Sequence, residues 1–371
     1  MAAIPGTLGV TSQTQGTRKS LPMAILSVRV PEVKDVAEGR PGKCPSCEST
    51  ILQGWGVAAK PIRDTTGSRT ITVRRYRCTA CGRTFRQYPQ GITAAAQTQR
   101  LQVAAAMMWA MGLSLRSATA FLKLFDAALC HQTVWRDAVA LGKRVAGRRP
   151  RRSVRVLGVD GTGARIAGQS SGVVVAVDMG SGQPVAFVEL DERDPEAVRK
   201  WLAPLVEQLG VEVLVTDDLA SYRPVAESLH LDHQVCLFHV KRYAGKMLAE
   251  LADSLGESWM PTIEDIRALL DDLPADGGYR LFDAWSQIKA PPTRPGEPDP
   301  PEQRLKRLML RLSNRWQALL LHQRRSDVPA TNNPSEQAIG RYKIRVKTMR
   351  GVKSAAGRTA IFHLCHARLV A

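Results

Sequence analysis

Four of the seven cysteines occur in two short pairs whose spacing is typical of metal ligands. The pairs are Cys44-Pro-Ser-Cys47 and Cys78-Thr-Ala-Cys81. Each C-x-x-C segment places two thiolates on one tight turn, and two such turns can complete the tetrahedral shell of a Zn²⁺ ion. Residues 68–77 between them are rich in β-branched and aromatic side chains, as the strands of a zinc ribbon require. We therefore predict one structural Zn²⁺; a redox pair or unrelated core thiols are the alternatives.

Two aspartates in the middle of the chain, Asp160 and Asp217, follow apolar segments that predict strands. Residues 153–160 alternate and carry β-branched side chains, and residues 211–216 form a buried apolar run. Carboxylates that converge at strand ends in an acidic cleft are what a divalent-metal phosphoryl-transfer site requires. Asp160 could instead be an ordinary turn residue. Asp218 competes with Asp217, but it could equally cap the helix that follows, so we favour Asp217.

The segments around these aspartates predict an α/β fold in which strands and helices alternate. The expected strands are residues 153–160, 172–177, 185–190, 211–216 and 233–238, and the expected helices are residues 194–209 and 219–229. The segment from Gly161 to Gly163 predicts a turn after the first strand. The order βββαβαβ is that of a ribonuclease-H-like fold, which carries its carboxylates on the first strand and after the fourth.

Charge is distributed unevenly along the 371 residues, whose net charge is +18. Residues 1–153 carry 24 Lys and Arg against 7 Asp and Glu, residues 154–301 carry 13 against 24, and residues 302–371 carry 15 against 3. Two basic segments around an acidic one indicate polyanion binding beside a region that gathers carboxylates. Nucleic acid is the usual polyanion for such a chain. A basic protein without such a partner is the alternative.

Residues 95–145 have a helical period and predict a helix-turn-helix domain. Apolar side chains recur every three or four positions over residues 101–115, and two further periodic segments follow, the last of them residues 131–143. In a helix-turn-helix this last segment would be the recognition helix, although a plain helical bundle has the same pattern. The side chains expected to contact DNA are Gln132, Thr133 and Arg136 on it, and Arg149 and Arg151 in the basic linker behind it.

The composition also bears on where the protein works. The longest mainly apolar stretch, residues 101–115, is too short to span a bilayer, and residues 21–28 lack the cleavage motif of a signal peptide. An odd number of cysteines with four at metal spacing favours a reducing compartment. We expect a cytoplasmic, nucleoid-associated protein of a prokaryote.

Four short motifs in the second half of the chain resemble those of a known family. They are Gly-Val-Asp160-Gly-Thr, Val-Thr-Asp217-Asp-Leu-Ala-Ser-Tyr, Cys236-Leu-Phe-His239 and Thr-Asn-Asn-Pro-Ser-Glu336. In this order they resemble the DDE transposases of bacterial insertion sequences. The Mutator-like superfamily is the closest match, because it carries a C-x-x-H motif shortly after the second aspartate. The resemblance covers roughly residues 150–371, and the ribbon and helices in front are similar to those of other insertion-sequence transposases.

The resemblance implies a DNA transposase that binds the terminal inverted repeats of its element, cleaves the ends by metal-dependent hydrolysis and joins the 3′-OH to target DNA. Asp160, Asp217 and Glu336 would hold two Mg²⁺ or Mn²⁺ ions about 3.5–4 Å apart, which clamp the attacking and leaving oxygens. The implied partners are double-stranded DNA and further copies of the chain, in a homodimer or a higher oligomer.

The segment around Glu336 also predicts the start of a helix. Asn333 as the N-cap and Glu336 at the third helical position would form a capping arrangement, which would itself hold the carboxylate rigidly. The helix that follows Glu336 has many basic side chains and few acidic ones to pair with them. This composition favours contacts with phosphate groups. These basic side chains are Arg341, Lys343, Arg345 and Lys347.

Three further residues are expected to position the carboxylates without binding the metal themselves: Cys236, His239 and Asn333. His239 would have a structural or DNA-contacting role. A core histidine beside a small buried thiol is the alternative, and so is a second zinc site that includes His230 or His233.

Together these patterns divide the chain into six segments. They are a mostly disordered segment 1–40, a zinc ribbon 41–92, a helix-turn-helix domain 93–150, the first part of the catalytic core 151–240, a helical insertion 241–328 and the C-terminal helices of the core 329–371. Two other functions fit the same segments: a DNA-binding regulator derived from an inactive transposase, and a ribonuclease-H-like nuclease. A joining assay separates them, since only a transposase joins the cut end to a second DNA.

Overall fold

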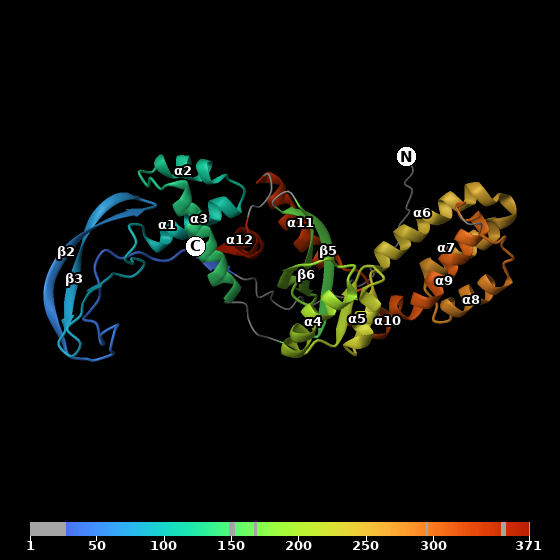
Figure 1. Ribbon diagram of the computed structural model, residues 1–371, viewed down its shortest axis with the longest axis horizontal. Coiled ribbons are helices and arrows are strands. Elements are labelled where there is room, and N and C mark those ends of the chain that lie inside the picture. The colour runs from blue at the N-terminus through green and yellow to red at the C-terminus, as the bar shows by residue number, and fades with distance from the viewer. Residues whose placement is uncertain (1–26, 148–152, 167–168, 294–295, 350–353, 371) are drawn as a thin grey trace, which may run out of the picture.

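The computed structural model describes residues 27–147, 153–166, 169–293, 296–349 and 354–370. The molecule is elongated, with a long β-hairpin at one end and a group of helices at the other (Figure 1). A second group of helices and a five-stranded sheet lie between them. Within the described residues, no helix is both long and apolar enough to cross a membrane.

The hairpin belongs to a three-stranded antiparallel sheet in the order β2-β3-β4. Its strands are β2 (Leu52–Asp64), β3 (Gly67–Cys78) and β4 (Thr84–Gln87). The strand expected over residues 68–77 is therefore present as β3. One end of this sheet has only a small buried cluster around Leu52 and Tyr76, and two of the paired cysteines, Cys44 and Cys78, are part of it.

Three helices follow where the periodicity predicted them: α1 (Gln99–Ala110), α2 (Leu115–Lys123) and α3 (His131–Gly147). Thr98 caps α1, since its hydroxyl accepts from the N–H of Leu101 at 3.2 Å. Ser114 caps α2 by accepting from the N–H of Ser117 at 2.9 Å. Hydroxyl caps of this kind explain why the apolar pattern is interrupted between the helices.

The chain end returns to these helices, which differs from the expected segment boundaries. Helix α12 (Ala355–Cys365) packs closely on α3, because a Cβ on Gly142 would lie only 2.6 Å from the Cα of Ala360. Strand β10 (Arg368–Val370) pairs in parallel with β1 (Ser27–Arg29). The segment 1–40 thus contains a paired strand, and α12 packs both on α3 and on the five-stranded sheet, where Phe362 stacks on Phe187 at 4.4 Å.

The five-stranded sheet has the order β7-β6-β5-β8-β9, in which only β6 runs antiparallel to its neighbours. The strands are β5 (Val156–Ile166), β6 (Gln169–Asp178), β7 (Gln183–Glu189), β8 (Val213–Thr216) and β9 (Asp232–Val235). Val174 and Ala176 of β6 belong to the core beneath helices α4 (Pro195–Leu209) and α5 (Tyr222–Ser228). Val173, Val175 and Val177 face α11 (Asn333–Thr348) on the other side. The expected order βββαβαβ is thus observed.

Several boundaries differ from the sequence prediction. Gly161 to Gly163 is not a turn, because β5 continues to Ile166 and pairs with β6 along its whole length. The last strand ends at Val235, and residues 237 and 238 begin helix α6 (Leu237–Leu255). Helix α5 begins at Tyr222, three residues later than expected. Sheet pairing and the position of Cys236 ahead of a helix decide these boundaries, and neither is visible in a local pattern.

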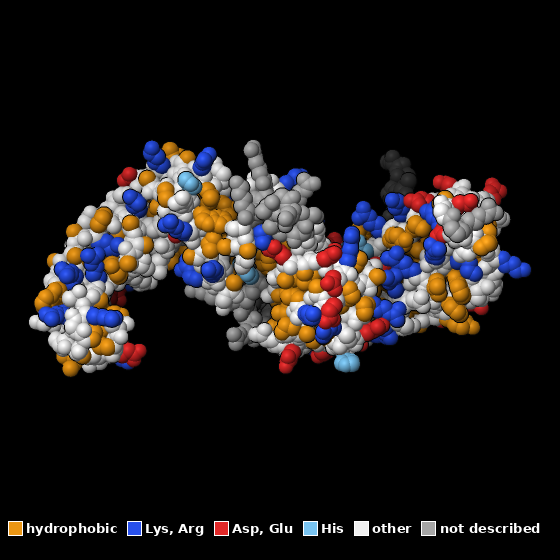
Figure 2. Space-filling view, in the orientation of Figure 1, with side chains coloured by type: hydrophobic (Ala, Val, Ile, Leu, Met, Phe, Trp, Pro, Cys, Tyr) orange, Lys and Arg blue, Asp and Glu red, His pale blue; other side chains and the backbone are white. Residues whose placement is uncertain are grey.

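The helical insertion begins at α6 and has its own hydrophobic core. Its other elements are the 3₁₀ turn Glu257–Trp259, α7 (Met260–Asp272), α8 (Gly277–Gln287), α9 (Pro301–Leu319) and α10 (Leu321–Arg324). Trp316 is buried against α8, since a Cβ on Gly278 would lie 2.7 Å from the Cβ of Trp316. Figure 2 shows Lys and Arg side chains gathered where this insertion adjoins the sheet, and acidic side chains on the sheet side.

Candidate active site

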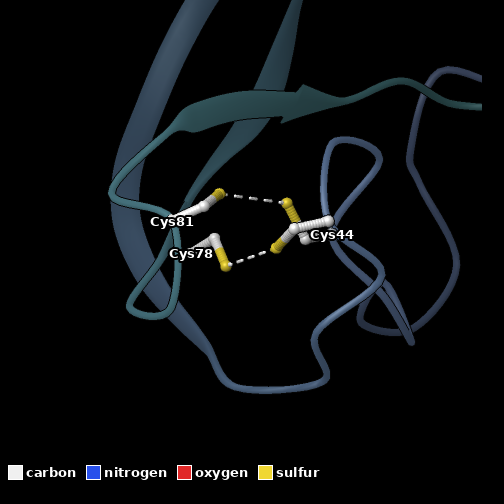
Figure 3. Close-up of side chains that lie close together, drawn as sticks. Cys44, Cys78 and Cys81 are labelled. Atoms are coloured by element: carbon white, nitrogen blue, oxygen red, sulfur yellow. Dashed lines mark hydrogen bonds between the residues drawn. The ribbon is translucent and has the colours of Figure 1, made fainter.

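The four paired cysteines lie together at the end of the β2–β3 hairpin. Their sulfurs all lie within 4.8 Å of one another. Cys44 Sγ is 3.8 Å from Cys81 Sγ, and Cys47 Sγ is 3.6 Å from Cys78 Sγ, as Figure 3 shows for the first pair. A tetrahedral Zn²⁺ with Zn–S bonds of about 2.3 Å needs sulfurs about 3.8 Å apart. The four side chains therefore fit a structural zinc ion.

The acidity of these thiols also depends on their crowding. The backbone N–H of Cys81 lowers the pKa of the Cys78 thiol to about 6. The backbone N–H of Ser46 lowers the pKa of the Cys44 thiol. The N–H of Ser49 acts in the same direction on Cys47, but the neighbouring sulfurs raise the pKa of that thiol to about 12. A bare cluster cannot hold four thiolates together, whereas a bound divalent cation would stabilise them.

The three carboxylates selected from the sequence come from three different elements. Asp160 lies within β5, opposite Val175 of β6, and not at a strand end as expected. Asp217 directly follows β8, which pairs in parallel with β5. Glu336 lies in the first turn of α11, which packs on β5 and β6. Neighbouring strands and a helix laid across them thus bring the three side chains to one region of the sheet.

The charges of these three side chains act on one another. Burial, followed by the charge of Asp217, raises the pKa of Asp160 to about 7, and Glu336 contributes in the same direction. Burial also raises the pKa of Asp217. A hydrogen bond from the N–H of Leu219 and the charge of His239 lower this pKa, whereas the charges of Asp218 and Glu336 raise it. Carboxylates that repel one another in a buried place favour a cation between them.

Glu336 offers a further indication that a ligand belongs in this region. Its Oε1 is inaccessible to solvent and makes no hydrogen bond within the described part of the chain. It lies 3.6 Å from Nε2 of His239. A buried carboxylate oxygen without a hydrogen bond is costly, and a divalent cation would satisfy it. Glu336 therefore carries an oxygen that a bound cation could satisfy, in a region where Asp160 and Asp217 add negative charge.

Asn332, and not Asn333, connects Glu336 to the sheet. Asn332 is completely buried and occupies the N-cap position, and its Nδ2 donates to the carbonyl of Val159 at 2.9 Å. Its N–H points at the sulfur of Cys236, 3.4 Å away. Asn333 is exposed, so the supporting role predicted for it is wrong by one residue. Packing decides which of two adjacent asparagines faces the core.

The C-x-x-H motif lies beside the start of α11. Cys236 is buried at the N-cap position of α6, and His239 lies in the first turn of that helix. The thiol of Cys236, the imidazole of His239 and the carboxylate of Glu336 lie within 4.8 Å of one another. His233, considered for a second zinc site, instead has its Nε2 2.9 Å from the hydroxyl of Thr216. Cys236 and His239 therefore lie beside Glu336.

Asp218 does not cap the following helix. Its carboxylate pairs with two arginines of α9: Nε of Arg311 donates to Oδ2 at 3.0 Å, and Arg315 forms an ion pair with Oδ1. Only 9% of the Asp218 side chain is exposed. Asp217 takes the local role instead, because its Oδ1 accepts from the N–H of Leu219 at 3.2 Å. Asp218 thus ties the end of β8 to the insertion.

We expect Asp218→Asn to lower the free energy of unfolding by about 2 kcal/mol, because two guanidinium groups lose their counter-charge. The effect is smaller than for a fully buried pair, since Arg311 and Arg315 are 35% and 20% exposed. Urea denaturation measures it. Asp271→Asn is the control, because the pair between Asp271 and Lys241 is exposed. Equal stability of both variants would show that the Asp218 pairs contribute nothing.

Most of the residues expected to contact DNA are accessible. Gln132 and Arg136 on α3 are exposed, and Thr133 is half-buried. On α11 the exposed basic residues are Arg341, Lys343 and Lys347. Arg149 and Arg151 lie outside the described residues.

Arg345, which was also expected to contact DNA, is buried. It is only 4% exposed, and its guanidinium donates to the carbonyls of Trp109 and Leu113 at the end of α1. It also lies over the ring of Trp109. Tyr342 and Arg345 are three residues apart and share the buried side of α11, so this arginine joins two parts of the protein and is not free to bind phosphate.

Several residues beside the site were not found from the sequence. They are Glu192, Asn332, Arg311 and Arg315. The first lies in a loop with other acids, and the two arginines lie in an insertion whose orientation no local pattern fixes. Asn332 and Asn333 are adjacent in the same motif, and the sequence does not distinguish which of the two is buried.

Comparisons with known proteins identify the family. No curated protein matches this chain. The Drosophila P element transposase strand transfer complex is similar over 74% of this chain and 92% of that chain, at 10% identity and a TM-score of 0.41, a likeness too distant to carry an argument. Residues 109–360 match the family described as "Transposase IS66 family", which agrees with the expected transposase and gives no support to the Mutator-like superfamily. Because the match spans more than half of the sequence, the chain belongs to the IS66 family of transposases.

Proposed function

We propose that this protein is a DDE-type transposase with a ribonuclease-H-like core, in which Asp160, Asp217 and Glu336 form the active site. The observation that carries the proposal is the placement of Asp160 on β5, Asp217 at the end of the neighbouring parallel strand β8 and Glu336 on α11, which packs on β5. Burial, followed by the charge of Asp217, raises the pKa of Asp160 to about 7. The sheet order β7-β6-β5-β8-β9 and the helix α11 across it support the same core. The family match supports transposition as the reaction.

The carboxylates would hold Mg²⁺ or Mn²⁺, which supplies charge stabilisation to the attacking and leaving oxygens of a phosphoryl transfer. The chain itself contributes position and burial. Asn332 fixes the start of α11 to β5, so that Glu336 has one orientation relative to Asp160. The partial burial of the carboxylates would strengthen charge interactions at the scissile phosphate. His239 would support Glu336 from the side, and Cys236 would anchor the loop before α11.

DNA recognition would fall to the basic front of the chain. Residues 1–153 have a net charge of +17, which suits phosphate contacts. Base edges would be read by three side chains at the start of α3: Gln132, Thr133 and Arg136. The phosphate backbone of the DNA would be held near the carboxylates by Arg341, Lys343 and Lys347. Helix α12 and α3 share one core with α11 and β6. DNA held by the front would therefore have a fixed position relative to the carboxylates.

A joining assay tests the proposal. The full chain is incubated with Mn²⁺, a labelled terminal repeat taken from the DNA flanking its gene, and a second, unlabelled DNA. A transposase nicks at the repeat boundary and produces labelled molecules of higher mass that contain both DNAs. Nicks without joined products would favour the nuclease, and specific binding without nicks would favour the regulator. Either result would contradict the proposed function.

A further inference from the structure

One face of helix α6 is exposed and begins beside the proposed active site. His239 lies in the first turn of α6, and its Nε2 is 3.6 Å from Oε1 of Glu336. Arg242 and Lys246 follow three and seven residues later, so they share the side of the helix on which His239 lies. Both are exposed. With a rise of about 1.5 Å per residue, Lys246 lies about 10 Å along the helix from His239. This face therefore leads from Glu336 into the helical insertion.

The charge of this face is positive. Residues 237–249 contain three basic side chains and no acidic one. Lys246 has only a long ion pair with Glu250, at 3.9 Å, and its side chain is 80% exposed. Arg242 forms no ion pair within the part of the chain that the structure describes. Figure 2 shows Lys and Arg side chains gathered where the insertion adjoins the sheet. Unpaired cations at such density fit a polyanion as the partner.

Two aromatic rings of the same helix are exposed beside these cations. Phe238 is 50% exposed and Tyr243 is 42% exposed. The guanidinium of Arg311 lies over the ring of Tyr243, 4.4 Å from its centroid, and Arg311 is itself held by the carboxylate of Asp218. The ring of Phe238 is edge-on to the imidazole of His239, with centroids 5.7 Å apart. Each ring thus has a neighbour that orients it and still has exposed area.

The combination of rings and cations indicates the chemistry of the partner. The phosphates of a DNA duplex require only cations, because its bases are stacked on one another and offer no free face. The bases of an unpaired strand do offer a free face, and exposed aromatic rings beside basic side chains are suited to bind them. A strand that is cut at the proposed active site has a free end, and the bases at this end can leave the duplex.

We propose that this face of α6 binds unpaired nucleotides of the DNA strand next to the scissile phosphate. Tyr243 and Phe238 stack on bases, and Arg242 and Lys246 contact phosphates. The inference rests on the proposed function and extends it to the helical insertion. Arg311 is a positioning residue, because it supports one side of the Tyr243 ring.

Binding of two forms of the terminal repeat to the zinc-loaded full chain tests the inference without cleavage. One form is a blunt duplex that ends at the repeat boundary. The other form, the flanked duplex, carries in addition about six unpaired nucleotides at that end, on either strand, which is enough to reach both rings. Fluorescence anisotropy without added Mg²⁺ or Mn²⁺ measures both affinities. Tyr243→Ala, Tyr243→Phe and Arg242→Ala are compared with Tyr279→Ala and Arg280→Ala, which change two exposed residues of α8 in the same insertion.

We expect the wild type to bind the flanked duplex more tightly than the blunt one. Tyr243→Ala should weaken binding of the flanked duplex by about tenfold and leave the blunt duplex unchanged, because one base loses its stacking partner. Unchanged binding of the blunt duplex also shows that the variant is folded. Tyr243→Phe keeps the ring and should equal the wild type. Arg242→Ala should reduce the slope of log K against log salt by about 0.7 for the flanked duplex, since one phosphate contact is lost. The two α8 variants should equal the wild type.

Equal binding of both duplexes by the wild type would overturn the inference and leave this face of α6 to a protein partner. A loss in Tyr243→Ala that is the same for both duplexes would also overturn it, because the ring would then not contact unpaired bases. Neither result affects the proposed function, which depends on the carboxylates. A wild type that binds neither duplex would overturn both.

Discussion

Asp160→Asn, Asp217→Asn and Glu336→Gln should each lower the rate of end cleavage by about three orders of magnitude, which corresponds to about 4 kcal/mol of transition-state stabilisation. Each substitution removes one negative charge that would organise the metal ions, while the size of the side chain is nearly preserved. Single-turnover cleavage of a labelled terminal repeat measures the rates. Binding of the same DNA, measured in the absence of metal, should be retained or slightly tighter, because one carboxylate no longer repels the scissile phosphate.

Glu207→Gln is the control for this series, since it removes a carboxylate from the exposed side of α4. Asp218→Asn adds a second comparison. Its carboxylate already pairs with Arg311 and Arg315, so its loss should affect stability more than the cleavage step. If Asp218→Asn abolished cleavage while Asp217→Asn remained active, the second catalytic carboxylate would be Asp218. Undiminished cleavage and joining in all three variants would refute the proposed active site.

Removal of zinc should unfold the ribbon while the rest of the chain stays folded. A structural Zn²⁺ in a small peptide contributes about 10–16 kcal/mol of apparent binding free energy at pH 7. The buried cluster beside the cysteines consists of only Cys44, Leu52, Tyr76 and Cys78, with Phe85 packed against it, which is too little to hold this end of the hairpin alone. Cys44→Ser combined with Cys78→Ser should therefore lose about one zinc per chain and become sensitive to proteases between residues 41 and 92.

Metal analysis and limited proteolysis measure these two effects. Cys130→Ser is the matched control, because Cys130 is an exposed thiol outside the cluster. It should keep the zinc content and protease resistance of the wild type. An unchanged zinc content in the double variant would show that the four cysteines do not form the metal site.

The sequence alone predicted most helices and strands and the cluster of four cysteines. The two C-x-x-C pairs predicted a four-cysteine cluster, and the sulfurs lie within 4.8 Å of one another. The helices α1, α2 and α3 lie where the apolar periodicity indicated. The order of strands and helices from β5 to β9 also followed from alternating and apolar runs. These features depend on neighbours in the chain, and such neighbours leave a periodic signal.

Only the tertiary structure decided what the charged side chains do. Asp217 and Asp218 are adjacent, yet Asp217 accepts from the nearby N–H of Leu219, and Asp218 pairs with Arg311 of an insertion more than ninety residues away. Arg345 is surrounded by exposed basic residues of α11, yet it is buried against the end of α1. The energy of a charge depends on its burial and on partners distant in sequence, and neither leaves a local pattern.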